Sequence, residues 1–359
     1  MGTRSLPPGP RRGRGAVSNP DNRYAAVRYE AFDDGWADAD PAAEPLRTQL
    51  TVDTSRTVIT RNDSPDVPFD RSINPYRGCE HGCVYCYARP SHAWLGLSPG
   101  LDFETRLFYK PRAAALLQQE LARPGYRCAP LALGVNTDAY QPVERRLELT
   151  RGLLRILAGQ RHPVTLVTKS ALIERDLDIL TDMAQRGLVQ ASISVTTLDA
   201  GLARRLEPRA AAPRRRLESM ARLADAGVPV GVMVAPVIPA LTDPELERIL
   251  EAARAAGARC AGYVLLRLPH EVEGMFAEWL EAHYPATASR VLNRVRDTRG
   301  GRMNDPRFGS RMRGVGEYAD LIAQRFRVAT RRLGFEGFPD LDVSAFVPPR
   351  GGDTQLELF

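Results

Sequence analysis

The sequence alternates between short apolar segments and longer amphipathic ones, and this alternation constrains the fold more than any other feature. Apolar segments of strand length occur at residues 72–76, 131–136, 164–168, 189–195, 228–235 and 262–266. Helical periodicity occupies the stretches between them, at residues 113–121, 143–158, 172–185, 214–226 and 243–256. Strands separated by helices predict βαβ units, and therefore a parallel sheet with right-handed crossovers.

Six such units are fewer than the eight of a closed barrel. We therefore predict an α/β fold, an open partial (β/α)6 TIM-like barrel, as the core at residues 51–268. Residues 1–50 are rich in Pro, Gly, Arg, Ala and Asp and predict a flexible leader. Residues 269–338 predict a helical C-terminal extension, and residues 339–359 predict a flexible tail.

The composition excludes several classes of protein. The chain has 359 residues, of which 43% are hydrophobic and 26% charged, so it has enough apolar material for a folded core. No apolar run reaches the roughly 18 residues of a membrane-spanning helix. The positive charges near the N-terminus are not followed by the apolar core of a secretory signal. We expect a cytoplasmic protein with no membrane partner.

Three of the five cysteines, Cys79, Cys83 and Cys86, lie within eight residues. This crowding suits metal binding in a reducing compartment better than disulfide bonding. Three thiolates from one loop can hold a [4Fe–4S] cluster and leave one iron open. The alternative is a zinc ion held by the three cysteines together with His81 or His92. Zinc ligands usually come as two separated pairs, so the spacing favours the cluster.

The spacing C-x3-C-x2-C, with the aromatic Tyr85 directly before the third cysteine, resembles the signature of the radical S-adenosylmethionine (SAM) superfamily. The resemblance covers residues 72–266 and implies an enzyme whose open iron chelates SAM. It also implies that an external electron donor reduces the cluster, which cleaves SAM to a 5′-deoxyadenosyl radical. In this resemblance Tyr85 is a cofactor-binding residue.

Residues 134–144, together with Lys169, resemble the branch of the superfamily that contains spore photoproduct lyase. The resemblance implies that the methionine amino group of SAM meets Asn136, Thr137 and Asp138. It also implies that Lys169 pairs with the SAM carboxylate, as a compact ammonium does well. The alternative is that Thr137 and Asp138 cap a helix and that Lys169 is a solvated loop lysine.

Two later strand ends extend the predicted cofactor site. Ser194, at the end of the fourth predicted strand, resembles a further hydrogen-bonding position for SAM, and residues 234–238 would flank the adenine. Such contacts belong at the carboxyl ends of barrel strands.

The chain departs from spore photoproduct lyase at one position. That enzyme uses a cysteine near the end of its second strand as a hydrogen-atom donor, whereas Val135 and Asn136 stand here. Photoproduct lyase activity is therefore not predicted. The candidate remote donors are Cys128 and Cys260, and the candidate radical relays are Tyr140 and Tyr87. For each of these four residues, packing in the core is the alternative.

Two features indicate a partner. Arginines crowd residues 204–216 and 290–313, and one face of the second stretch could follow a DNA backbone or could simply be solvated. The last five residues resemble the peptide that docks bacterial repair proteins on the sliding clamp, with Gln355, Leu356, Leu358 and Phe359 as its defined positions. The alternative is that these apolar side chains fold back on the body.

The first hypothesis is thus a radical SAM enzyme that acts on DNA, in repair or modification, and docks on the sliding clamp. A second hypothesis replaces DNA with a small molecule, RNA or a protein. A third is a non-catalytic, zinc-stabilised binding module.

Overall fold

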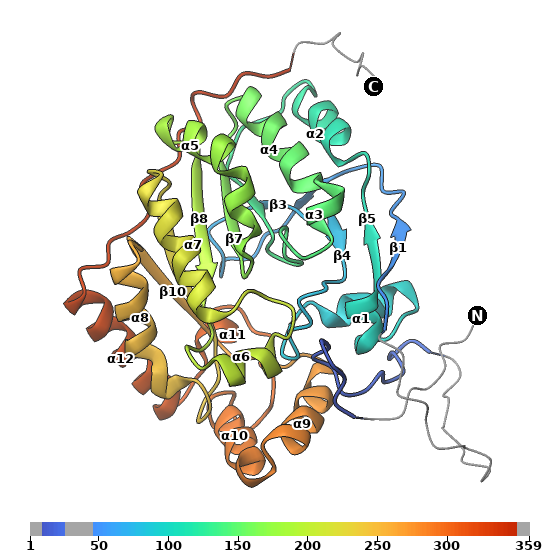
Figure 1. Cartoon of the computed structure of the whole chain (residues 1–359), viewed down its shortest axis with the longest axis vertical. Helices are drawn as coiled ribbons and strands as arrows, with labels where there is room; N and C mark the ends of the chain where they lie inside the picture. The colour runs from blue at the N-terminus through green and yellow to red at the C-terminus, as the bar shows by residue number, and fades with distance from the viewer. Residues whose placement is uncertain (1–8, 26–45, 350–359) are drawn as a thin grey trace.

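Six parallel strands form the centre of the molecule in the computed structural model, which describes residues 9–25 and 46–349 (Figure 1). In chain order they are β3 (Arg71–Ile73), β6 (Leu131–Leu133), β7 (Val164–Thr168), β8 (Val189–Ser194), β9 (Val230–Val237) and β10 (Cys260–Leu265). They lie side by side in that same order, and β2 (Ile59–Arg61) adds an antiparallel edge to β3. The predicted α/β fold with a parallel sheet of the partial-barrel kind is confirmed.

Helices cover one face of this sheet and bury its apolar side chains. They are α2 (Ala113–Leu121), α4 (Leu149–Gly159), α5 (Leu177–Gln185), α7 (Pro213–Asp225) and α8 (Leu246–Ala255). Their apolar stripes join the strands in one large hydrophobic core. Burying each Val or Leu side chain of this core contributes roughly 1.5–3 kcal/mol to the free energy of unfolding.

The first predicted strand, at residues 72–76, is divided between two sheets. β3 ends at Ile73, and β4 (Tyr76–Arg77) instead pairs with β5 (Arg106–Tyr109) in a small sheet that also contains β1 (Gln49–Val52). Pro75 stands between them and has no N–H to donate to a ladder, which explains the break.

The predicted helix at residues 143–158 is likewise two helices, α3 (Glu144–Leu147) and α4. Glu148 between them has the left-handed φ of 50°, which ends the first helix. Short 3₁₀ turns, η2 (Ala171–Asp176) and η3 (Asp243–Glu245), precede α5 and α8.

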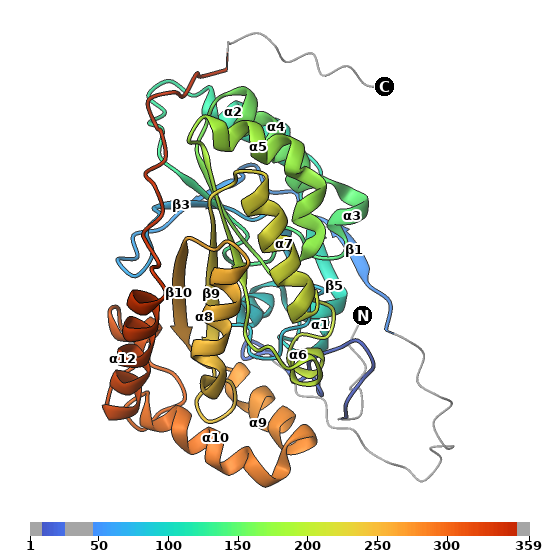
Figure 2. The same ribbon diagram turned by 60° about the vertical axis from the view of Figure 1, so that its left-hand side comes forward.

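The C-terminal extension packs against the core in two places. Helices α9 (Val272–His283) and α10 (Pro285–Asp297) lie at the end of the molecule where the strands point, and α12 (Glu317–Arg332) lies beside α8 (Figure 2). A second hydrophobic cluster joins Phe276 and Trp279 of α9 to Val84 and Tyr85 of the cysteine loop. In the part of the chain that the structure describes, no helix has the length and apolar character needed to cross a membrane.

Both predicted flexible ends need correction where the structure describes them. Residues 9–25 pack on the body, and Ala16 and Val17 are only 0% and 5% exposed. Residues 339–349 cross the amino ends of the strands, where Phe346 packs on Tyr126 and His162. Backbone bonds from Asp342 to Gly187 and from Val347 to Gln160 fix this segment. Buried side chains and paired backbone groups hold both segments in place. The low hydrophobicity of these segments did not predict such contacts.

Candidate functional site

The cysteine loop, residues 78–88, runs from β4 to the 3₁₀ helix η1 (Arg89–Leu95). Neighbouring elements fix its backbone. The Cys79 N–H donates to the Phe103 carbonyl (2.9 Å), and the Val84 N–H donates to the Leu206 carbonyl (3.1 Å). The buried Gln141 amide accepts from the Glu80 N–H at 2.9 Å and donates to the Gly78 carbonyl. The loop is therefore held from several parts of the chain.

An N-terminal brace, residues 13–19, supports the loop from outside. Gly15 lies so close to Gly82 that a Cβ on Gly15 would be 1.7 Å from the Gly82 carbonyl oxygen. The fully buried Glu104 accepts from the N–H groups of Gly15 (3.0 Å) and Ala16 (2.8 Å), and it forms an ion pair with Arg89. Arg89 in turn donates to the Cys83 carbonyl, which ties the brace to the cysteine loop.

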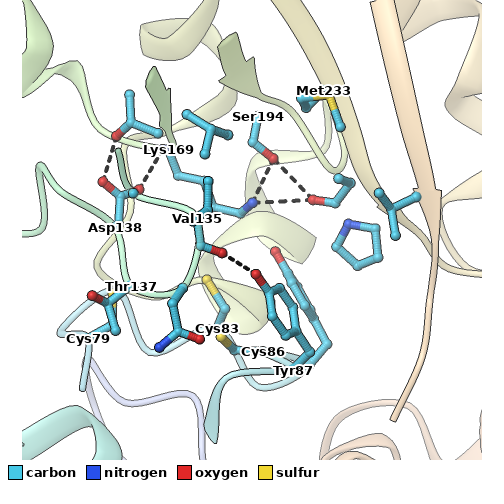
Figure 3. A pocket seen from close by; sticks show the side chains of 18 of the residues that line it. Cys79, Cys83, Cys86, Tyr87, Val135, Thr137, Asp138, Lys169, Ser194 and Met233 are labelled. Carbon is cyan, nitrogen blue, oxygen red and sulfur yellow. Dashed lines mark hydrogen bonds between the residues drawn. The ribbon is translucent and has the colours of Figure 1, made fainter. Parts of the chain in front are cut away.

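The side chains of Cys79, Cys83 and Cys86 line one cavity of about 290 Å³ (Figure 3). Burial raises the pKa of the Cys83 thiol to about 12, and burial also raises the pKa values of Cys79 and Cys86. Thiols of this kind become thiolates when metal binds them. Three soft ligands on one loop, facing one cavity, fit an iron–sulfur cluster.

The two histidines of the zinc alternative are already engaged. His92 lies outside the cavity, with its Nε2 atom 2.9 Å from the Arg106 carbonyl oxygen and its ring against Phe103. His81 lines the cavity, but its Nδ1 atom lies 3.3 Å from a carboxylate oxygen of Asp138. Across residues 9–25 and 46–349, no three His, Cys, Asp or Glu side chains are grouped so as to hold a single metal ion.

Asp138 is half-buried in the loop that follows β6, and several groups of this chain bind its carboxylate. It accepts from the Thr168 hydroxyl (2.7 Å) and from the Lys169 N–H (2.8 Å), in addition to its pair with His81. Burial opposes its ionisation, but the pair with His81 and these hydrogen bonds prevail and lower its pKa to about 2. Asp138 is thus an ionised carboxylate that joins the cysteine loop to the ends of β6 and β7.

Lys169 and Ser194 meet above the cysteines. The Lys169 ammonium donates to the Ser194 hydroxyl (2.6 Å) and to the Ala235 carbonyl (3.2 Å) (Figure 3). It also lies 4.0 Å from a carboxylate oxygen of Glu207. The Tyr85 ring lies 5.9 Å from the same ammonium, and the Tyr85 hydroxyl donates to Glu207. The ends of β7, β8 and β9 therefore present a fixed cation to the cavity.

The remaining predicted cofactor residues also line this cavity. The Asn136 N–H donates to the side chain of Asn74 at 3.0 Å, while the Thr137 hydroxyl donates to the Tyr76 carbonyl at 2.9 Å. Thr137 therefore does not cap the following helix with its side chain. From the predicted adenine segment, residues 234–238, Ala235 and Pro236 line the cavity.

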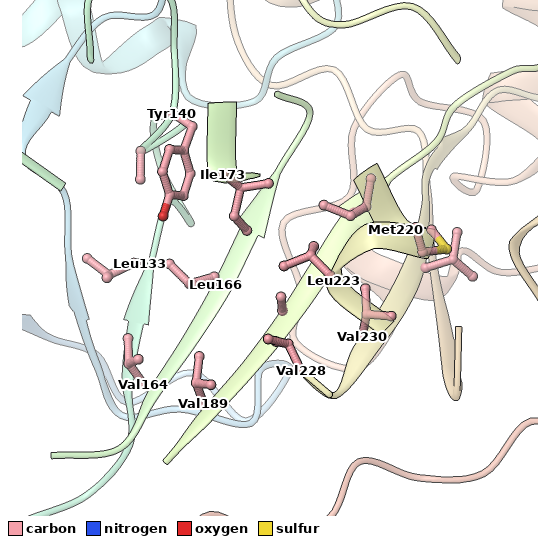
Figure 4. Close-up of a cluster of buried hydrophobic side chains, with 14 of the residues drawn as sticks. Leu133, Tyr140, Val164, Leu166, Ile173, Val189, Met220, Leu223, Val228 and Val230 are labelled. Carbon is pink, nitrogen blue, oxygen red and sulfur yellow. The ribbon is translucent and has the colours of Figure 1, made fainter. Parts of the chain in front are cut away.

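The candidate hydrogen donors and one candidate relay lie elsewhere. Cys260 begins β10 at the end opposite the cavity, and Cys128 lies before the amino end of β6. Tyr140 is fully buried in the core near Leu133 (Figure 4). Tyr87 does line the cavity, where its hydroxyl donates to the Val135 carbonyl.

Three site residues were missed from the sequence. Glu207 lies on the buried side of Tyr85 and Lys169 and is paired with the buried Arg216. Gln141 fixes the cysteine loop, and Arg267 lines the cavity after β10. The sequence carries no signal that separates these residues from ordinary surface residues, because single Glu, Gln and Arg side chains are usually exposed.

Comparison with known proteins finds relatives of similar sequence. An uncharacterized protein of Mycobacterium tuberculosis (strain ATCC 25618 / H37Rv) is 39% identical over 226 residues, which cover 62% of this chain and 66% of that protein. An uncharacterized protein of Methanocaldococcus jannaschii is 24% identical over 223 residues, which cover 62% of this chain and 80% of that protein. This chain thus matches just under two thirds of the mycobacterial protein.

Solved structures share the fold at low sequence identity. One spore photoproduct lyase structure is 17% identical, covers 79% of each chain and gives a TM-score of 0.56. Another, with AdoMet and a dinucleoside spore photoproduct bound, is 16% identical with the same coverage and TM-score. The sequence model of the radical SAM superfamily matches residues 73–253, which is half of the chain. The chain therefore belongs to the radical SAM superfamily, whose enzymes use a [4Fe–4S] cluster and SAM.

Proposed function

We propose that this radical SAM enzyme acts on DNA, in repair or modification, and that residues 355–359 dock it on the bacterial sliding clamp. The observation that supports radical chemistry is that the three cysteines, Lys169 and Ser194 all line one cavity. When bound there, the reduced cluster supplies the electron that cleaves SAM.

The residues of the chain divide the work of binding. Cys79, Cys83 and Cys86 would hold the cluster as thiolates. Lys169 would pair with the SAM carboxylate, and Ser194 would orient the Lys169 ammonium by the hydrogen bond between them. Apolar side chains complete the lining and exclude water from a reactive species, among them Val67, Phe69, Val264 and Met312.

The position of the short helix α11 (Ser310–Arg313) supports a polyanionic substrate. Met312 of this helix lines the cavity, and the adjacent Arg313 is exposed. Arg302, in the segment before α11, is also exposed, and a phosphate backbone that reached the cavity could meet such cations. A lyase of similar fold binds a dinucleoside photoproduct, which agrees with this direction.

Part of the predicted arginine face has other roles. Arg299 is buried and donates to the carbonyls of Leu265 and Leu266. Arg307 is paired with Asp305, and Arg311 with Asp66. The proposed DNA contact therefore depends on the smaller exposed set around Arg302 and Arg313. The docking positions Gln355, Leu356, Leu358 and Phe359 lie outside the described residues.

The test is SAM cleavage by the reconstituted, reduced enzyme with and without ultraviolet-irradiated or intact DNA. Stimulated release of 5′-deoxyadenosine by one form of DNA supports the proposal. Equal release with and without DNA, together with stimulation by an RNA, protein or small-molecule pool, would reject DNA as the substrate.

The docking half of the proposal is tested separately with purified sliding clamp. A chain ending at residue 354 should lose binding that the full chain shows. Equal binding by the two chains, or no binding by either, would reject this half.

A further inference from the structure

Arg267 is the basic residue of the cavity that no part of the proposed SAM site uses. It follows β10 by two positions, so it lies at the same carboxyl edge as Lys169 and Ser194. Its guanidinium lies over the Tyr87 ring, 4.6 Å from the ring centroid. Tyr87 in turn binds the Val135 carbonyl after β6. The Arg267–Tyr87 pair therefore connects strand ends that lie far apart in the sheet.

The backbone around Arg267 is fixed, although its side chain is not committed. Arg299 donates to the Leu266 carbonyl directly before it, and the Leu268 N–H donates to the Met303 carbonyl directly after it. Within residues 9–25 and 46–349, no carboxylate forms an ion pair with the Arg267 guanidinium and no acceptor takes a hydrogen bond from it. A partly buried arginine in this condition lacks the counter-charge that such groups normally have.

The acidic groups that could neutralise Arg267 are held by other residues. Asp66 accepts from Arg311 and from the Gly309 N–H. Asp138, the carboxylate among the described residues that line the cavity, is bound to His81, Thr168 and the Lys169 backbone. Among the described residues, the Arg267 guanidinium therefore has no ion-paired carboxylate at the open side of the cavity, where it lies over the 44% exposed Tyr87.

We propose that Arg267 is the substrate-anchoring residue and that it binds a phosphodiester group of the DNA substrate at the open side of the cavity. The inference rests on the proposed DNA function and extends it to a residue. A planar guanidinium forms two parallel hydrogen bonds to phosphate oxygens, and the Tyr87 ring beneath it fixes the plane. Lys169 remains the partner of the SAM carboxylate, so Lys169 binds the cofactor anion and Arg267 binds the substrate phosphate.

The experiment compares binding of two fluorescent ten-nucleotide thymidine oligonucleotides to the SAM-loaded holoenzyme. One has natural phosphodiester linkages and the other has neutral methylphosphonate linkages. The variants are Arg267→Gln and Arg267→Lys, with Arg254→Gln as the matched control. Arg254 is also stacked on an aromatic ring, that of Phe335, but it lies near the amino end of β10 and outside the cavity.

For the charged oligonucleotide we expect Arg267→Gln to weaken binding about 10-fold and to lower the salt dependence by about one phosphate contact. Arg267→Lys should recover part of this loss, and Arg254→Gln should bind as the wild type does. With the neutral oligonucleotide the difference between wild type and Arg267→Gln should disappear. SAM affinity should stay unchanged, and iron content reports that each variant is folded.

Three results would overturn the inference. If Arg267→Gln bound the charged oligonucleotide as well as wild type, the inference alone would be wrong. If the variant lost SAM affinity instead, Arg267 would be a cofactor contact. If wild type bound neither oligonucleotide, the proposed DNA function would be wrong and this inference would go with it.

Discussion

Glu207 shows how one buried charge organises the cofactor end of the cavity. Its carboxylate receives hydrogen bonds from Tyr85, Thr196 and Arg216 and lies 4.0 Å from the Lys169 ammonium. Burial opposes its ionisation, but the attraction of Arg216 and Lys169 prevails and lowers its pKa to about 2. The position of the predicted SAM-binding lysine thus depends on a carboxylate that SAM need not touch.

We expect Glu207→Gln to reduce the free energy of unfolding by about 3–5 kcal/mol at pH 7, because Arg216 would keep a buried and unpaired charge. The folded pKa of Glu207 is depressed, so its stabilisation is complete above the ordinary glutamate value near ~4.3 and is lost as the pH falls toward 2. Urea unfolding of metal-free protein between pH 5 and 3 should therefore show a shallower loss in the variant. Parallel curves would contradict this account of Glu207.

Lys169 offers a sharper test of the cofactor site. Lys169→Met removes a charge-assisted contact worth about 1.5–3 kcal/mol, so SAM affinity should fall at least about 10-fold while iron content stays at the wild-type level. Anaerobic titration calorimetry measures the affinity. Lys110, the other lysine of the chain, lies outside the cavity and provides Lys110→Met as the control. Normal SAM binding by Lys169→Met would remove Lys169 from the site.

At the scale of elements, the N-terminal brace shows most clearly that the cysteine loop depends on a distant segment of the chain. Residues 13–19 contact the loop through Gly15 and bind Glu104, about ninety positions later in the chain. Such a contact positions the cysteine ligands without touching the cluster.

Replacing Gly15 by Ala should displace the brace, because the new Cβ would lie 1.7 Å from the Gly82 carbonyl oxygen. Losing the two backbone hydrogen bonds to Glu104, at about 0.5–1.5 kcal/mol each, should speed the removal of iron by a chelator about 10-fold. Gly274→Ala on α9 is the control, since nothing lies within 4 Å of its added Cβ. Equal release rates would show that the brace does not retain the cluster.

The elements show which parts of the fold local sequence determines. β7 and α2 have the predicted boundaries because their periodicity is uninterrupted and their neighbours are turn-forming. Residues 9–25 and 339–349 were predicted to be flexible, since their own composition offers little apolar surface. They are ordered by partners far away in the chain, such as Glu104 for Gly15 and Tyr126 for Phe346. Local pattern cannot report such contacts.

The site divides in the same way. Asp138, Lys169 and Ser194 lie at or just after the ends of β6, β7 and β8, and a parallel sheet brings strand ends together, so topology predicts their meeting. The cysteine loop follows β4 of the small sheet and reaches the same cavity. Glu207 directly follows α6 (Ala200–Leu206) and Arg216 lies near the start of α7, where the two are buried and paired with each other. Their burial is a property of the assembled fold.

At the scale of the whole molecule, the extension closes the site from two sides. Helix α9 shares a hydrophobic cluster with the cysteine loop, and α11 brings Met312 to the cavity. In the proposed function the barrel would supply the cofactor contacts, while the extension and the loop after β10 would supply the side of the cavity that faces a substrate.

The most direct measurement of the central claim is SAM cleavage by anaerobically reconstituted protein. After loading with iron and sulfide and reduction with dithionite, the wild type should release 5′-deoxyadenosine, and Cys79→Ala should release none. A protein that carried iron and acid-labile sulfide but never cleaved SAM, or that bound zinc in their place, would contradict the account.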